Sequence, residues 1–205
     1  MRIKLAEEIQ SLLNKVSALV NLYDSADYDF VNSLKKWFVN CEQVLIRYRK
    51  PQVSELASLR GLVSAAEKGI YEASFASFES RTPRRKKAAA IAIFSLHRAQ
   101  SSLQSIILPL LGKLEETETI IKNILTLCSR KGQLSQYWKE DIPKNERLKL
   151  LWKAMTEDKD TAEATQRVLT LISYSDALQM IDRIMTEWSD DFKNANANLD
   201  PPHKK

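Results

Sequence analysis

The strongest candidate for binding chemistry in this chain is a basic segment, Arg81-Thr82-Pro83-Arg84-Arg85-Lys86-Lys87. It carries five positive charges in seven residues, and no acidic residue occurs from Ser80 to Leu114. Thr82 and Pro83 are typical of an N-cap followed by a first helical position, so residues 84–87 are predicted to form the first turn of a helix. Unpaired backbone N–H groups and the positive end of the helix dipole lie at the same place. N–H donors and cationic side chains that converge in this way suit a phosphate group, and we expect a nucleic-acid contact here.

Three other interpretations of the basic segment stay open. A basic turn in water is screened by salt and can bind nothing, or it can contact an acidic protein surface or lipid headgroups. Positive charge is concentrated in residues 1–110, which favours an anionic partner only weakly. If the helix predicted at 27–49 lies beside the basic segment, its cations extend the patch. These are Lys35, Lys36, Arg47, Arg49 and Lys50.

Aromatic rings among the cations would allow unpaired bases to stack on the protein. Trp37 and Tyr48 are candidates, but both lie near the apolar face of the predicted helix and are expected in the core. A second aromatic and basic neighbourhood lies at 134–152 and contains Tyr137 and Trp138. We expect this neighbourhood to bind a protein partner or to pack against the rest of the chain.

The chain lacks the residue patterns of enzymes and metal proteins. The two histidines, His97 and His203, have no catalytic or ligand partner at a recognisable spacing. Glycine-rich phosphate loops, paired CxxC motifs and a Glu-x-x-His pair are missing from the sequence. Cys41 and Cys128 lie in apolar helical patterns, so we expect reduced, buried thiols. The sequence therefore predicts a protein that is not an enzyme and uses no cofactor and no metal.

Apolar residues recur every three or four positions along almost the whole chain, which is typical of amphipathic helices. Only four glycines and six prolines occur in 205 residues, and this scarcity also favours long helices. Pro109 predicts a break or kink near residues 108–112. The capping box Asp160-x-x-Glu163 predicts the start of one long last helix. The predicted helices cover residues 3–23, 27–49, 54–80, 82–108, 113–130, 146–155 and 160–193.

Small residues form a stripe at four-residue spacing along the helix predicted at 54–80. The stripe consists of Gly61, Ala65, Gly69 and Ala73. Glycine weakens a helix interior, so its repetition on one face predicts that another helix approaches closely. Packing within the bundle is the favoured interpretation, and a seam between two copies or with a partner is the alternative. Gly61 and Gly69 are therefore candidate partner-binding residues.

These observations predict an all-α protein, an antiparallel bundle of about five long helices plus a segment of short helices. Residues 1–131 are expected to form the bundle core, residues 132–193 short helices and a long C-terminal helix that packs on it, and residues 194–205 a disordered tail. We expect a cytoplasmic protein, because no secretory signal or membrane span is visible. The predicted function is that of a non-enzymatic subunit of a larger assembly that contacts nucleic-acid phosphates. The alternative is a helical adaptor whose partners are proteins only. A protein partner is expected, self-association stays open, and membrane association is not expected.

Overall fold

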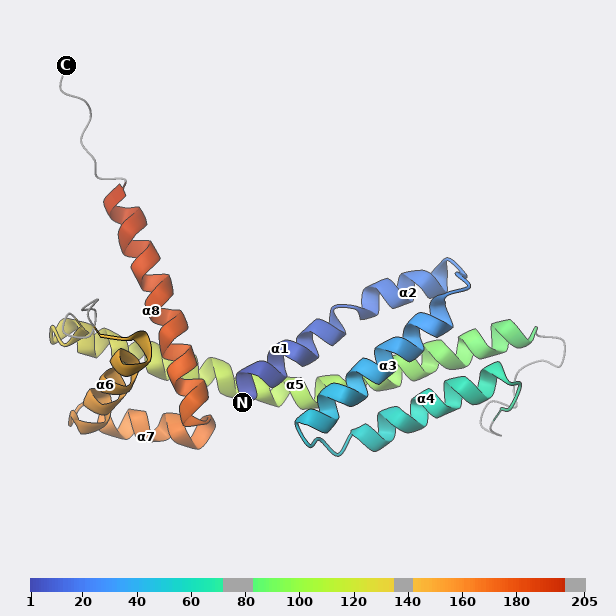
Figure 1. Ribbon diagram of the computed structural model, residues 1–205, viewed down its shortest axis with the longest axis horizontal. Coiled ribbons are helices and arrows are strands. Elements are labelled where there is room, and N and C mark those ends of the chain that lie inside the picture. The colour runs from blue at the N-terminus through green and yellow to red at the C-terminus, as the bar shows by residue number, and fades with distance from the viewer. Residues whose placement is uncertain (72–82, 135–141, 198–205) are drawn as a thin grey trace, which may run out of the picture. The chain divides into compact units, whose positions relative to one another are not determined.

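The residues that the structure describes are mostly helical. The computed structural model describes residues 1–71, 83–134 and 142–197, with side chains up to residue 188. Helices and no strands occur in these ranges (Figure 1), which confirms the all-α prediction. The helices form two compact units, one of residues Lys4–Leu110 and one of residues Met1–Ile3 with Leu111–Lys205.

The Lys4–Leu110 unit is an antiparallel bundle. After α1 and α2, α3 runs back along them, α4 reverses the direction, and α5 reverses it again (Figure 1). The C-terminal ends of α2 and α4 therefore lie at the same end of this bundle as the start of α5. The helices are α1 (Arg2–Leu13), which belongs to this unit from Lys4 onwards, α2 (Val16–Asp24), α3 (Phe30–Arg47), α4 (Val53–Glu67) and the first part of α5 (Arg84–Arg130).

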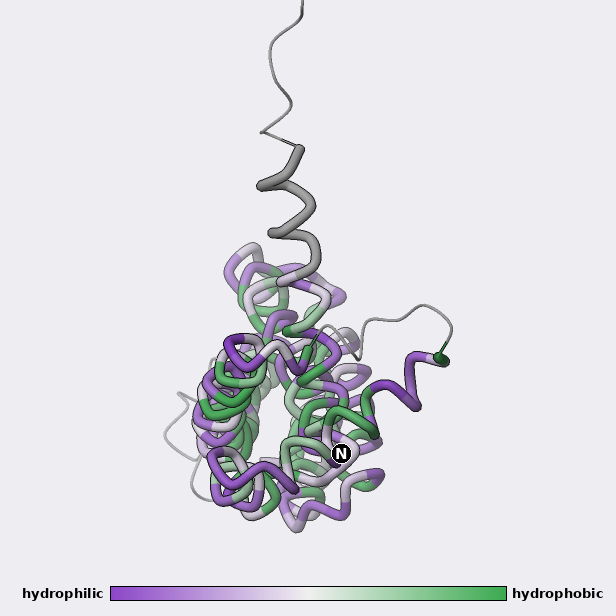
Figure 2. The backbone as a smooth tube through the Cα atoms, turned by 90° about the vertical axis from the view of Figure 1, so that its left-hand side faces the viewer, coloured by the Kyte–Doolittle hydropathy of each residue, from purple (hydrophilic) through white to green (hydrophobic). Residues whose placement is uncertain are grey.

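Helix α3 packs against both α2 and α4. Its buried side chains follow the predicted spacing, and those of Leu34, Phe38, Cys41 and Leu45 are fully buried. Hydrophobic and hydrophilic positions alternate along the helices in Figure 2, as expected when each helix buries one face. The predicted buried face of the 27–49 helix is thus confirmed.

The single helix predicted at 3–23 is interrupted after Leu13. In a continuous helix the carbonyl of Leu12 would accept a hydrogen bond from the amide of Val16. Instead it accepts the indole N–H of Trp37 at 2.9 Å and the amide of Lys15 at 3.2 Å. A tertiary contact from α3 therefore replaces the helical hydrogen bond, and α2 starts anew at Val16.

The helix predicted at 54–80 is shorter in the structure, where α4 ends at Glu67. Gly69 follows with a φ of +81°, a left-handed conformation in which glycine is favoured. The amide of Gly69 donates to Ala66 and the amide of Ile70 to Ala65, which satisfies the last carbonyls of α4. The small-residue stripe is therefore not one helical face, since Gly69 terminates the helix. Ala73 lies outside the described residues.

Helix α5 passes through Pro109 without the predicted break. Proline has no amide to donate to the carbonyl of Ser105, four residues earlier. Ser105, Leu108 and Pro109 are all exposed, so water can replace the missing donor, and the regular turns on both sides carry the helix through. The helix continues from Arg84 to Arg130.

The second unit is built from the rest of α5 with α6 (Lys144–Glu157), α7 (Ala162–Leu171) and α8 (Tyr174–Ala197). The short helix predicted at 146–155 is confirmed by α6. Ile3, from the start of the chain, is buried in the core of this unit. The other large buried side chains of this core include Ile121, Ile124, Leu125, Leu151, Trp152, Met155, Val168, Met180, Ile181, Ile184 and Met185.

The single last helix predicted from Asp160 is divided into α7 and α8. Ile172 adopts an extended conformation between them. Ser173 then starts α8, because its hydroxyl accepts the amide of Asp176 at 3.3 Å and donates to the Asp176 carboxylate at 2.7 Å. The predicted capping box at Asp160 is not formed, since no side chain caps α7.

The unit boundary lies within α5, between Leu110 and Leu111, whereas the sequence predicts one after residue 131. Helix α5 supplies buried side chains to both cores, Ile107 to one and Ile121 to the other. Helix α8 extends to Ala197, into the segment predicted as a tail, and residues 198–205 lie outside the description. None of the helices in the described ranges has the length and apolar character needed to cross a membrane.

Candidate nucleic-acid interface

The basic segment begins α5, as the sequence predicts. The helix starts at Arg84, and the amide of Lys87 donates its first hydrogen bond to the carbonyl of Pro83. Pro83 precedes the helix rather than opening it, and Arg81 and Thr82 lie outside the described residues. The side chains of Arg84, Arg85 and Lys86 are exposed, and Lys87 is half-buried.

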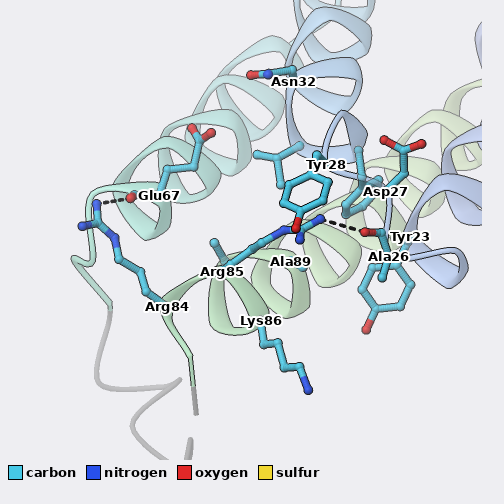
Figure 3. Close-up of a pocket in the computed structure, with 13 residues that line it drawn as sticks. Tyr23, Ala26, Asp27, Tyr28, Asn32, Glu67, Arg84, Arg85, Lys86 and Ala89 are labelled. Atoms are coloured by element: carbon cyan, nitrogen blue, oxygen red, sulfur yellow. Dashed lines mark hydrogen bonds between the residues drawn. The ribbon is translucent and has the colours of Figure 1, made fainter. Parts of the chain in front are cut away.

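Two of these cations donate hydrogen bonds to carbonyls at the C-terminal ends of neighbouring helices. Arg84 donates to the carbonyl of Glu67, the last residue of α4, and Arg85 donates to the carbonyl of Ala26 at 2.7 Å (Figure 3). Ala26 follows the end of α2 with a φ of +52°. A helix C-terminus carries partial negative charge. Cations at this position are unfavourable for the N-terminus of α5 but favourable for the C-termini of α2 and α4. This is a structural reason why arginines occur at the start of α5.

Arg85 also stacks on an aromatic ring that the sequence analysis did not select. Its guanidinium carbon lies 3.3 Å from the ring centroid of Tyr28, in the connection between α2 and α3. Tyr28 is 84% exposed, although tyrosine usually buries much of its ring. The two arginines and Tyr28 border a cleft of about 770 Å³ (Figure 3). The cleft is lined by Tyr23, Ala26, Asp27, Tyr28, Phe30, Val31, Asn32, Glu67, Arg84, Arg85, Lys86, Ala88 and Ala89.

The two lysines of the segment are less engaged than the arginines. The Lys86 side chain has no hydrogen bond or ion pair with another described residue, and it extends away from the arginines in Figure 3. The ammonium group of Lys87 lies 5.7 Å from the ring centroid of Tyr71, at the outer limit of a cation–π contact. Among the described residues of this first turn, these lysines are the ones without a capping role.

Only part of the predicted extension on α3 reaches the site. Lys35 forms an ion pair with the Glu67 carboxylate at 2.8 Å. Glu67 therefore interacts with two cations, with Lys35 through its carboxylate and with Arg84 through its backbone carbonyl. Lys36 is exposed and borders a smaller hollow of about 400 Å³ with Lys35 and Arg60.

The remaining cations of the predicted patch lie towards the other end of α3. Arg47 is twelve positions after Lys35, which is about 18 Å along a helix. Arg47 forms two hydrogen bonds of 2.9 Å with the carboxylate of Glu8, and Arg49 and Lys50 follow the end of α3. The structure therefore joins Lys35 to the basic helix start and separates Arg47, Arg49 and Lys50 from it.

The aromatic residues proposed for stacking occupy other places. Trp37 is 3% exposed and belongs to the core, as expected. Tyr48 is half-buried and donates a hydrogen bond to Glu8. Burial, together with this hydrogen bond, raises the pKa of the Tyr48 hydroxyl. Trp152, in the second aromatic and basic neighbourhood, is buried in the core of the other unit, and Tyr137 and Trp138 lie outside the described residues.

Among the described residues, no other helix closely approaches the glycines proposed as a contact seam. A Cβ atom at Gly61 would meet nothing within 4 Å. A Cβ atom at Gly69 would lie 3.5 Å from the Nε of Arg84, which is ordinary van der Waals contact. Close packing within the bundle therefore does not explain Gly61. Its role in partner binding stays a prediction.

The described residues contain no group of three or more histidine, cysteine or carboxylate side chains that could hold a metal ion. Cys41 and Cys128 are free and buried, as predicted. Burial raises the pKa of both thiols above the ordinary value, so neither is activated as a nucleophile. His97 is exposed on α5.

Comparisons of the chain with protein-family models, with curated proteins and with solved structures gave no match. Its function is therefore argued from the geometry and chemistry of the site alone.

Proposed function

We propose that this protein is a non-enzymatic helical subunit of a larger assembly that contacts nucleic-acid phosphates through the start of α5. The observation that carries the proposal is the first turn of α5, in which four consecutive basic residues include three exposed side chains, those of Arg84, Arg85 and Lys86. The capping partners of Arg84 and Arg85 are neutral carbonyls, not carboxylates. Each guanidinium has five N–H donors, so both arginines can donate to a phosphate while they cap a neighbouring helix.

The capping role explains why arginines occur at positions 84 and 85, but it does not explain Lys86 and Lys87. Both lysines add positive charge to a helix start that already has it, where cations are unfavourable. Neither has an ion pair with another described residue. Binding of an anionic partner supplies the missing stabilisation, and the phosphate backbone of a nucleic acid presents such charges in a regular series.

The test is a binding titration of the purified full chain with labelled single-stranded and double-stranded oligonucleotides. We expect binding that weakens steeply between about 50 and 200 mM salt. The variant Lys86→Glu/Lys87→Glu should bind at least about tenfold more weakly and show a smaller salt slope, because two phosphate contacts are lost. The arginines are left unchanged because their removal would also disturb the caps of α2 and α4.

The matched control is Lys149→Glu/Lys153→Glu, which makes the same charge change at two exposed positions of α6 in the other unit. It should retain most of the affinity. Equal weakening by both variants would show attraction to net charge alone and would overturn the proposal. Absence of binding at about 50 mM salt would also overturn it and leave the protein-only adaptor as the remaining function.

A further inference from the structure

The exposed ring of Tyr28 is held in place, which distinguishes it from an ordinary surface tyrosine. The Arg85 guanidinium covers one face of the ring at 3.3 Å, and a hydrogen bond of 2.7 Å to Ala26 fixes that guanidinium. With 84% of Tyr28 exposed, the opposite face of the ring is open. An oriented ring with one free face can accept another flat group without losing further rotamer freedom.

The cleft beside this ring has the size and lining for one flat heterocycle. Its volume of about 770 Å³ lies within the usual range for small-molecule sites. Tyr23, Phe30 and Val31 line it with apolar groups. Asp27 and Asn32 place hydrogen-bonding groups on its border (Figure 3). Carboxylate and amide groups can pair with the donor and acceptor edges of a base.

The charges around the cleft favour a nucleotide, with its neutral base and anionic phosphate, rather than an acidic peptide. Asp27 and Glu67 line the cleft and would repel carboxylates inside it. Arg84 and Lys86 stand at its border as exposed cations. A nucleotide meets both requirements, because its uncharged base can enter the cleft and its anionic phosphate can contact the cations at the border.

We infer that Tyr28, stacked on Arg85, is a platform for one unpaired base of a single-stranded nucleic acid. The base lies on the free face of the Tyr28 ring, and the phosphates on its two sides contact Arg84 and Lys86, whose side chains extend in different directions (Figure 3). A paired base in a duplex already stacks on its neighbours and offers no free face to a ring in a cleft. This inference rests on the proposed function and adds the class of nucleic acid to it.

The test compares a labelled single strand with the duplex of the same sequence on the full-length protein and its Tyr28 variants. We expect the single strand to bind more tightly than the duplex. Tyr28→Ala and Tyr28→Leu should each weaken single-strand binding about 5- to 150-fold, the loss expected when one stacked base loses its ring. Tyr28→Phe keeps the ring and should bind like the wild type. Circular dichroism checks that all three variants are folded.

A fluorescent base analogue in the strand gives a second measurement, because stacking on Tyr28 quenches its emission. Quenching should be lost in Tyr28→Leu and kept in Tyr28→Phe. Equal binding of single strand and duplex, with no effect of Tyr28→Ala, overturns the inference, while a loss on Lys86→Glu/Lys87→Glu would still support the phosphate contact. Absence of binding to either form overturns both.

Discussion

Alanine at two of the glycines is expected to change stability in opposite directions. Gly61 lies inside α4 with open space around it, so Gly61→Ala should stabilise the Lys4–Leu110 unit by about 0.5–1 kcal/mol through higher helix propensity. Gly69 has a φ of +81°, and Gly69→Ala should destabilise the same unit by about 1–2 kcal/mol because of left-handed backbone strain. The nearest contact of its Cβ is an ordinary 3.5 Å, so the expected loss comes from the backbone and not from a clash.

The assay for this pair is urea unfolding followed by tryptophan fluorescence. The chain has four tryptophans, and Trp37 is the one within residues 4–110. A background of Trp138→Phe, Trp152→Phe and Trp188→Phe therefore leaves Trp37 to report on this unit alone. If the two alanine variants shift the midpoint in the same direction, the assignment of Gly61 to an open helix face and of Gly69 to a helix stop is wrong. Destabilisation by Gly61→Ala in particular would indicate a close neighbour and return Gly61 to a contact seam.

Three further substitutions test other parts of the structure. Arg85→Ala should destabilise the Lys4–Leu110 unit by about 1–2 kcal/mol, since it removes a charged hydrogen bond and a cation–π contact. The control Lys86→Ala should change the free energy of unfolding by no more than about 0.5 kcal/mol. Equal urea midpoints for the two variants would contradict the capping role of Arg85. Pro109→Ala restores a helical donor and should raise the free energy of unfolding by about 1–3 kcal/mol; an unchanged thermal midpoint would argue against it. The side-chain hydrogen bond from Lys131 lowers the pKa of Asp158 from 3.8 to about 2. The ionised Asp158 carboxylate therefore stabilises the fold above pH 3.8, and this stabilisation is lost as the pH falls towards 2. Lys131→Met should raise the pKa of Asp158, measured by NMR titration, towards 3.8. An unchanged pKa in this variant would refute the prediction.

Regular helices with one buried face were predictable because their periodicity is a local property. The fully buried Leu34, Phe38, Cys41 and Leu45 follow it along α3, and α6 lies where its apolar pattern predicts. Helix interruptions were less predictable, because some depend on distant residues. The break after Leu13 depends on the indole of Trp37, 25 residues from Leu12, and no pattern within residues 3–23 reports it.

One missed interruption did have a local signal. Ser173-x-x-Asp176 has the spacing of a capping box, and the structure uses it to start α8. The capping box predicted from the sequence is the similar Asp160-x-x-Glu163. There the hydroxyl of Thr161 donates to the carbonyl of Met155 at 2.7 Å, and no side chain caps the helix.

The cations of the candidate site were predictable from the sequence, but the aromatic ring of Tyr28 was not. Its cations stand out as an unbroken run, but Tyr28 lies between Asp27 and Asp29, an acidic context that hides its pairing with a cation. The residue that covers its ring, Arg85, is 57 positions further along the chain. Only the alternation of helix directions brings the α2–α3 connection to the start of α5.

The position of Ile3 in the core of the second unit has a consequence for folding. The amide of Arg2 donates to the Asp176 carboxylate at 2.8 Å, across 174 residues of sequence. Closing a loop of that length is costly in chain entropy, and contacts of such separation form slowly. Prior folding of residues Lys4–Leu110 into their own bundle would shorten the effective loop. The chain is thus nested, with one unit inserted into the sequence of the other, and the inner unit is expected to fold first while the outer one is completed last.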